Sequence, residues 1–256
     1  MHLIPALPIR IFLIVAALAA PLSIRATEES GASPAAIKAG LSYLRALESA
    51  AAAYAEGQLP AALDKLDLAD QIHPNIPDTW NMRGAIYAQQ RSYEKAQAAF
   101  EKAAELNPGD FWPQYNLAEL SLLQKNYPQA VAQFQRLKIY AGHGELIDFK
   151  IVLADLLLGK PDAAKPVLDA MKFPCDTPAY YFAHAAWGFE QKDSSDGNYW
   201  TYAGIKVFGV PRCLSFYDSL VQAGLLPPRN ADGSIPDQSA ASAFPDPTPG
   251  ADLFQH

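Results

Sequence analysis

Few residues in this chain are of types that carry chemistry, and no catalytic motif brings them together. Its 256 residues include five histidines and two cysteines. They contain no HExxH pair of zinc ligands, no glycine-rich phosphate loop, no G-x-S-x-G turn and no CxxC pair. Cys175 and His184 would serve as nucleophile and base, but no orienting acid or oxyanion arrangement is recognisable beside them. The sequence therefore predicts a non-catalytic chain that needs no cofactor.

Two short patterns resemble metal sites only in part. His73 and His143 stand far apart in the sequence, in predicted turns that would have to converge on one ion. Residues 193–198 are acidic like a calcium loop, but they lack the regular alternation of ligands and the closing glutamate. We interpret the histidines as turn or surface residues and the acidic run as a solvated turn, so we expect no metal site.

The elements that would position any site are indicated by a period of 34 residues. Alanines recur on this period, and a bulky apolar residue follows each of them by four positions: Ala62 and Leu66, Ala96 and Phe100, Ala130 and Phe134, Ala164 and Leu168. An alanine lets two helices cross closely, and the residue one turn later lies on the same face and fills the adjoining gap. Helix-start signals share the period at Pro60, Glu94 and Pro128. The pattern predicts a stack of similar helical hairpins.

One unit, residues 77–110, is clearest. Its distinctive residues are Trp80, Gly84, Tyr87, Ala96, Phe100, Ala103 and the closing Pro108. This arrangement resembles the tetratricopeptide repeat (TPR), with Arg83 in place of the usual leucine. The resemblance extends to units at 43–76, 111–144, 145–178 and 179–212, the last with a degenerate second half.

The resemblance implies an all-α fold, a right-handed α-solenoid of about five hairpins over residues 43–212. Ser33 and Pro34 predict the start of a helix that leads into the first repeat from the segment 27–42. A further helix at 213–226 would cap the last apolar face. From Pro227 to the end the chain is rich in proline and polar residues, and we expect a disordered tail over 227–256.

The N-terminus has the pattern of an export signal over residues 1–26. Arg10 precedes an apolar run at 11–20, and Ala26 offers a small residue at a plausible cleavage point. The run is short for a membrane span, although an uncleaved anchor and a buried helix are alternatives. We therefore expect an exported protein, periplasmic or secreted.

The net charge of this chain narrows the class of its partner, and its two cysteines raise the question of a disulfide. Beyond residue 26, 18 Lys and Arg stand against 27 Asp and Glu, a net charge of −9 that disfavours nucleic acid and suits a protein partner. In an oxidising compartment Cys175 and Cys213 are candidates for a disulfide. The alternative is two buried free thiols, since equivalent turns of stacked repeats lie too far apart to bridge.

The resemblance also implies a concave groove lined by the first helix of each hairpin, which receives a peptide or a partner helix. Family groove positions fall on Leu47, Asn81, Trp112, Tyr115, Glu119, Phe149, Tyr180 and Trp187. None is a lysine or arginine, which argues against the subclass that clamps C-terminal carboxylates. The alternative is that Tyr115, Phe149 and Trp187, which stand at helical spacing, are core residues between hairpins.

We expect an exported adaptor that binds another protein without catalysis. Two alternatives stay open. The repeats would mediate self-association in a structural envelope protein, or the chain would be an accessory module whose aromatic residues stack on the sugar rings of cell-wall polysaccharide.

Overall fold

The computed structural model describes residues 33–236, and each of its regular elements there is an α-helix. The export signal expected at 1–26 and the tail beyond 236 lie outside the described residues. The helices are α2 (Pro34–Ala55), α3 (Leu59–Ile72), α4 (Pro77–Gln89), α5 (Tyr93–Leu106), α6 (Phe111–Leu123), α7 (Tyr127–Leu137), α8 (Gly144–Leu157), α9 (Pro161–Ala170), α10 (Ala179–Glu190), α11 (Ser194–Phe208) and α12 (Val210–Gln222). The predicted all-α helical repeat is confirmed.

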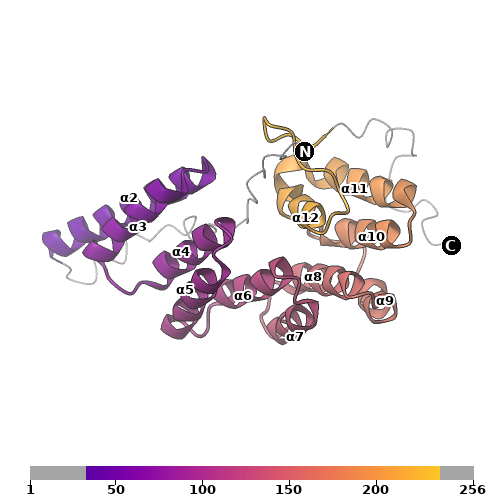
Figure 1. Cartoon of the computed structure of the whole chain (residues 1–256), viewed down its shortest axis with the longest axis horizontal. Helices are drawn as coiled ribbons and strands as arrows, with labels where there is room; N and C mark the ends of the chain where they lie inside the picture. The colour runs from indigo at the N-terminus through magenta and orange to yellow at the C-terminus, as the bar shows by residue number, and fades with distance from the viewer. Residues whose placement is uncertain (1–32, 237–256) are drawn as a thin grey trace, which may run out of the picture. The chain divides into compact units, whose positions relative to one another are not determined.

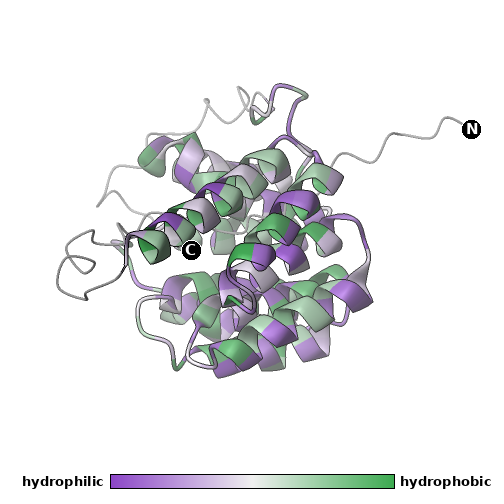
Figure 2. Ribbon diagram, turned by 90° about the vertical axis from the view of Figure 1, so that its left-hand side faces the viewer, coloured by the Kyte–Doolittle hydropathy of each residue, from purple (hydrophilic) through white to green (hydrophobic). Residues whose placement is uncertain are grey.

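The chain divides within α6 into two compact units, unit 1 up to residue 120 and unit 2 from residue 121. In unit 1, α2 packs against α3 and α4 packs against α5. In unit 2, α8 packs against α9 and α10 against α11, and α12 follows as a single helix (Figure 1). Hydrophobic and hydrophilic residues mix along the helices, as expected where each helix buries one face (Figure 2).

The residues of the 34-residue period form the interior of both units. The four alanines are completely buried, and their bulky partners are at most 2% exposed: Ala62, Ala96, Ala130 and Ala164, with Leu66, Phe100, Phe134 and Leu168. Helix starts follow the predicted signals. The Ser33 side chain accepts a hydrogen bond from the amide of Ala36 at 3.2 Å, and Pro60 and Pro128 stand in the first turns of α3 and α7.

The turn inside each hairpin repeats as well. Gly57, Arg91, Lys125 and Gly159 stand 34 residues apart, and each has a positive φ between 59° and 77°. Only glycine adopts this left-handed conformation without a steric cost. Two of the four are long charged residues, so this feature of the repeat is not visible in the sequence pattern.

Residues 227–236 differ from the expected disordered tail. The Arg229 guanidinium pairs with both carboxylate oxygens of Asp218 on α12, at 2.9 and 3.1 Å. The Tyr217 hydroxyl donates to the carbonyl of Pro227 at 3.0 Å, and Ile235 packs against the core of unit 2. This segment follows α12 closely because its arginine finds a carboxylate there, a pairing that composition alone does not reveal.

Cys175 and Cys213 are free thiols, so the candidate disulfide is not formed in this structure. Cys213 is buried on α12, where its thiol donates to the carbonyl of Gly204 at 3.4 Å. Cys175 lies between α9 and α10 and is half-buried. Burial raises the pKa of Cys175 to about 11 and the pKa of Cys213 to about 12. Of the alternative, two buried free thiols, this structure shows Cys213 buried and Cys175 only half-buried.

The contact between Gly84 and Phe100 provides a test of hairpin packing. A methyl group at position 84 would lie 2.5 Å from two ring carbons of Phe100, in a completely buried crossing of α4 and α5. We expect Gly84→Ala to lower the free energy of unfolding by about 1–3 kcal/mol, the usual effect of overpacking. Gly40→Ala is the matched control, because that α2 glycine has no atom within 4 Å of an added methyl.

The control should raise stability by about 0.5–1 kcal/mol through helix propensity. Urea unfolding followed by circular dichroism measures both changes. Equal effects of the two substitutions would contradict the close crossing.

Thiol titration tests the free cysteines. Unreduced, denatured protein should give two titratable thiols per chain. In the folded protein at pH 8, Cys175 should react on the order of 100-fold more slowly than an ordinary cysteine, because little of it is thiolate. Cys213 should react more slowly still. In the Cys175→Ser variant, only the slow reaction of Cys213 should remain. No titratable thiol in the unreduced protein would mean that the two cysteines are bridged.

Candidate partner-binding surfaces

The expected groove residues of unit 1 separate into buried and half-buried sets. Leu47 is 3% exposed and belongs to the core formed by α2, α3 and α4, so its assignment to an open groove needs correction. Tyr115 is 7% exposed, which supports its alternative reading as a core residue. Asn81, Trp112 and Glu119 are half-buried, so part of each side chain is accessible to solvent.

Around Tyr115, the start of α6 gathers three aromatic rings. Trp112 meets Phe111 and Tyr115 edge-on, with ring centroids 4.9 and 5.8 Å apart. The Trp112 amide donates to the Asp110 carboxylate at 3.1 Å. Burial, followed by the charge of Glu119, raises the pKa of Tyr115 well above its ordinary value. The phenol therefore stays protonated, and its ring forms a fixed base against which Trp112 is held.

Asn116 is a member of this surface that sequence reasoning missed. Its side-chain amide donates to the Asn81 side-chain oxygen at 2.8 Å, which joins α6 to α4. Asn116 is only 3% exposed, so the contact fixes the orientation of Asn81. The only signal in the sequence was that Asn116 stands 35 residues after Asn81, one position past the equivalent site of the next repeat. That signal is too weak to identify Asn116.

Arg83 has a defined role at the position where the family pattern has leucine. Its guanidinium lies over the Trp80 ring, 5.6 Å from the centroid. It also donates to the carboxylates of Asp67 and Asp70 on α3. The arginine therefore ties the first hairpin to the second.

In unit 2, the expected groove position Phe149 is completely buried and in contact with α12. Its ring lies 5.2 Å from that of Phe216 on α12, measured between centroids. The next residue, Lys150, donates from its ammonium to the Ser219 hydroxyl on α12 at 2.8 Å. Phe149 is therefore not an open groove residue, and this part of α8 already has an occupant.

Tyr180 and Trp187, the other groove candidates of unit 2, are half-buried on α10. Tyr180 lies in an aromatic cluster with His184 and Trp200, at centroid distances of 4.4 and 5.9 Å. Burial, with a smaller effect of the Lys165 charge, lowers the pKa of His184 to about 4. His184 is thus a neutral member of an aromatic stack. The Lys165 ammonium faces Trp187, 5.8 Å from the ring centroid.

Two negative findings concern residues 33–236. Histidine, cysteine, aspartate and glutamate nowhere gather there in a group of three or more that would hold a metal ion. Within the same range, no helix is both long enough and apolar enough to cross a membrane.

Comparisons with known proteins locate repeats of a known family in this chain. A family model described as tetratricopeptide repeat matches residues 77–110, and another with the same description matches residues 99–132. Tetratricopeptide repeat protein 37 of Xenopus laevis is 28% identical over 106 residues, or 41% of this chain. Superkiller complex protein 3 of Homo sapiens is 30% identical over 134 residues, or 48% of this chain. The chain spans only 6% and 8% of the lengths of these relatives.

Solved structures agree on the fold. A thermophilic TPR protein from Thermus thermophilus aligns with a TM-score of 0.56 and 17% identity, covering 72% of this chain and all of the other. PilF of Pseudomonas aeruginosa aligns with a TM-score of 0.53 and 14% identity, covering 72% of this chain and 92% of the other. The family-model matches identify tetratricopeptide repeats within residues 77–132, and the solved structures show that the described helices share the fold of tetratricopeptide repeat proteins.

Proposed function

We propose that the chain is a non-catalytic adaptor that binds a peptide or partner helix on the α4–α6 surface of unit 1, defined here by Asn81, Trp112 and Glu119. The observation that carries this proposal is the half-buried Trp112 ring, held edge-on against two neighbouring aromatic rings. An aromatic side chain fixed before binding loses little entropy when a partner covers it, and tryptophan is enriched among residues that dominate binding energy.

The polar members of the α4–α6 surface suggest the partner's chemistry. Asn81 is oriented by Asn116 and offers amide groups suited to a peptide backbone. Glu119, which is hydrogen-bonded to Tyr115, brings a negative charge to this surface, and that charge favours a partner with a basic residue nearby. All three residues lie within the stretch that the two repeat models match, 77–132. The name of the human relative describes a member of a protein complex, which fits a role in protein binding.

We also propose that residues 1–26 direct export. The support is the sequence pattern of a basic residue, a short apolar run and a small residue before Thr27. An adaptor of this kind would act in the cell envelope or outside the cell.

Substitution of Trp112 tests the binding surface. Trp112→Ala should reduce recovery of the native partner about 10-fold or more in a quantitative crosslinking pull-down from envelope extract, because a central aromatic anchor is lost. Tyr93→Ala is the control, since Tyr93 is a half-buried aromatic residue of the same unit on the second helix α5. It should leave recovery unchanged. If Trp112→Ala also leaves recovery unchanged while circular dichroism shows a folded protein, the α4–α6 surface is not the binding site.

Fractionation and N-terminal sequencing test export. We expect the native protein in the periplasm or medium, with a mature sequence that begins near Thr27, because the segment has the cleavage pattern of a signal peptide. A chain in the membrane fraction that still begins at Met1 would support the uncleaved anchor instead. Recovery of the full-length chain in the cytosol would contradict export altogether.

A further inference from the structure

The first described helix, α2, has apolar residues on two faces. One face is buried against α3. On the other face, residues recur at alternating intervals of four and three positions, the spacing of the seam between two coiled helices. We call this set the α2 stripe, and its members are Ile37, Leu41, Leu44, Glu48, Ala51 and Ala55. Leu44 and Ala51 border the core of unit 1, whereas Ile37 is 39% exposed and Leu41 is 51% exposed.

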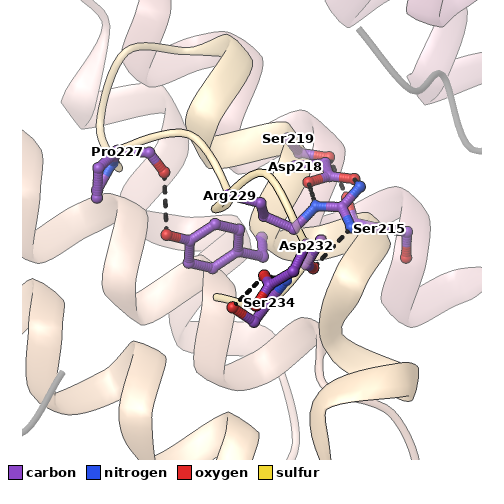
Figure 3. Close-up of polar contacts among 9 residues, drawn as sticks. Ser215, Asp218, Ser219, Pro227, Arg229, Asp232 and Ser234 are labelled. Carbon is purple, nitrogen blue, oxygen red and sulfur yellow. Dashed lines mark hydrogen bonds and ion pairs between the residues drawn. The ribbon is translucent and has the colours of Figure 1, made fainter. Parts of the chain in front are cut away.

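The last helix, α12, shows how a terminal helix of this chain is covered. Figure 3 shows Arg229 of residues 227–236 turned toward Asp218 of α12, where the two side chains are 11% and 14% exposed. Ile235 of the same segment packs against the core of unit 2. End helices of a repeat array need a polar outer surface or a cover to keep the protein soluble as a monomer. Among the described residues the α2 stripe has neither, because its large residues near the helix start stay in contact with solvent.

Side-chain size along the α2 stripe suits a second copy of α2 that runs in the opposite direction. The three large aliphatic residues stand in the first half, and the two alanines stand in the second. The intervals of four, three, four, three and four are the same from either end, so a reversed copy meets the stripe position by position. Ile37 then lies opposite Ala55 of the second copy, and Leu41 lies opposite Ala51. Large residues interdigitate with small ones in this arrangement, whereas a parallel copy would hold the two halves at different separations.

The charges beside the stripe favour the same direction of pairing. Lys38 and Arg45 stand in the first half of α2, whereas Glu48 stands in the second half and Glu56 at the C-cap. This order opposes the helix macrodipole, which favours acidic residues at the start of a helix and basic residues at its end. In an antiparallel pair, Lys38 approaches Glu56 of the second copy and Arg45 approaches Glu48. Two-fold symmetry forms each contact twice, so the charges of α2 are complementary to those of its own reversed copy.

We propose that two copies of the chain pair through the α2 stripe, as antiparallel helices related by a two-fold axis between Leu44 and Glu48. The pairing uses no residue of the α4–α6 surface. It therefore goes beyond the adaptor function and gives a dimer that carries that surface twice. The seam is less than three heptads long, so we expect a dissociation constant on the order of 10 µM, at the weak end for specific interfaces.

Sedimentation equilibrium of the full chain tests the pairing. Over concentrations from about 10-fold below to about 10-fold above that dissociation constant, the average mass should rise from one chain toward two. Leu41→Glu should weaken association on the order of 100-fold, because it brings a carboxylate into the apolar seam of both copies. Leu68→Glu is the matched control, since Leu68 is a 46% exposed leucine on α3, outside the stripe. It should leave association unchanged.

A charge exchange tests the direction of pairing. Lys38→Glu should weaken association about 10-fold, because it sets two like charges together at each end of the seam. The double variant Lys38→Glu with Glu56→Lys should restore the wild-type mass, because opposite charges then meet again. Both positions are exposed, so circular dichroism should show folded variants. A stripe covered by a segment of the same chain would give no such rescue.

Disulfide cross-linking gives a second measure of direction. A mixture of Ile37→Cys and Ala55→Cys chains should form linked dimers on mild oxidation, because the two positions lie opposite each other. Ile37→Cys chains alone should not link through this residue, since the two copies of position 37 are about 27 Å apart along the antiparallel seam. The wild-type chain measures any background from Cys175.

Three results would overturn the dimer: a single-chain mass at every concentration, association that survives Leu41→Glu, or cross-links between Ile37→Cys chains. A monomer that Leu41→Glu strongly destabilises would place a segment of the same chain on the stripe, which also contradicts the proposal. Trp112→Ala should leave association unchanged while it reduces native-partner recovery. Absence of a dimer with that recovery effect retained would refute the pairing and spare the adaptor function.

Discussion

The close crossing of two helices within each hairpin is the constraint on which the rest of the structure depends. At α4 and α5, Gly84 leaves room for the Phe100 ring where even a methyl group would lie 2.5 Å from its carbons. Ala96, one turn before Phe100, is completely buried beside it. Such a hairpin is only two helices thick, so it cannot bury its apolar side alone and must stack on a neighbour. The recurrence of small and bulky residues follows directly from that need.

Ion pairs decide local details on this scaffold. Arg83 links α4 to α3, and Arg229 links residues 227–236 to α12. The two arginines differ in their surroundings: the Asp67 and Asp70 partners of Arg83 are 60% and 26% exposed, whereas the Asp218 partner of Arg229 is 14% exposed. Solvent screens the first pair strongly, so we expect the second to contribute more to the position of its segment.

The first helices of the hairpins are used differently in the two units. In unit 1, Asn81, Trp112 and Glu119 are partly exposed and form a surface that other side chains orient. In unit 2, Phe149 and Phe182 are completely covered and in contact with Phe216 of α12. One chain thus combines a partly exposed surface in unit 1 with a face in unit 2 that its own helix covers.

The sequence by itself determined the helices, their pairing into repeats and the residues that pack inside them. These properties depend on neighbours within one or two turns, so a period such as that of Ala62, Ala96 and Ala130 reports them directly. The positive φ of Arg91 and Lys125 could not be predicted, because the geometry of the turn imposes it on residues that do not favour it.

Only the tertiary structure decided which apolar positions stay exposed. Leu47 and Phe149 have the spacing of groove residues, yet both are covered. Phe216 packs on Phe149, and the ion pair between Arg229 and Asp218 holds residues 227–236 against α12. Contacts between separate helices depend on how the chain folds back, and a local periodic pattern carries no information about that.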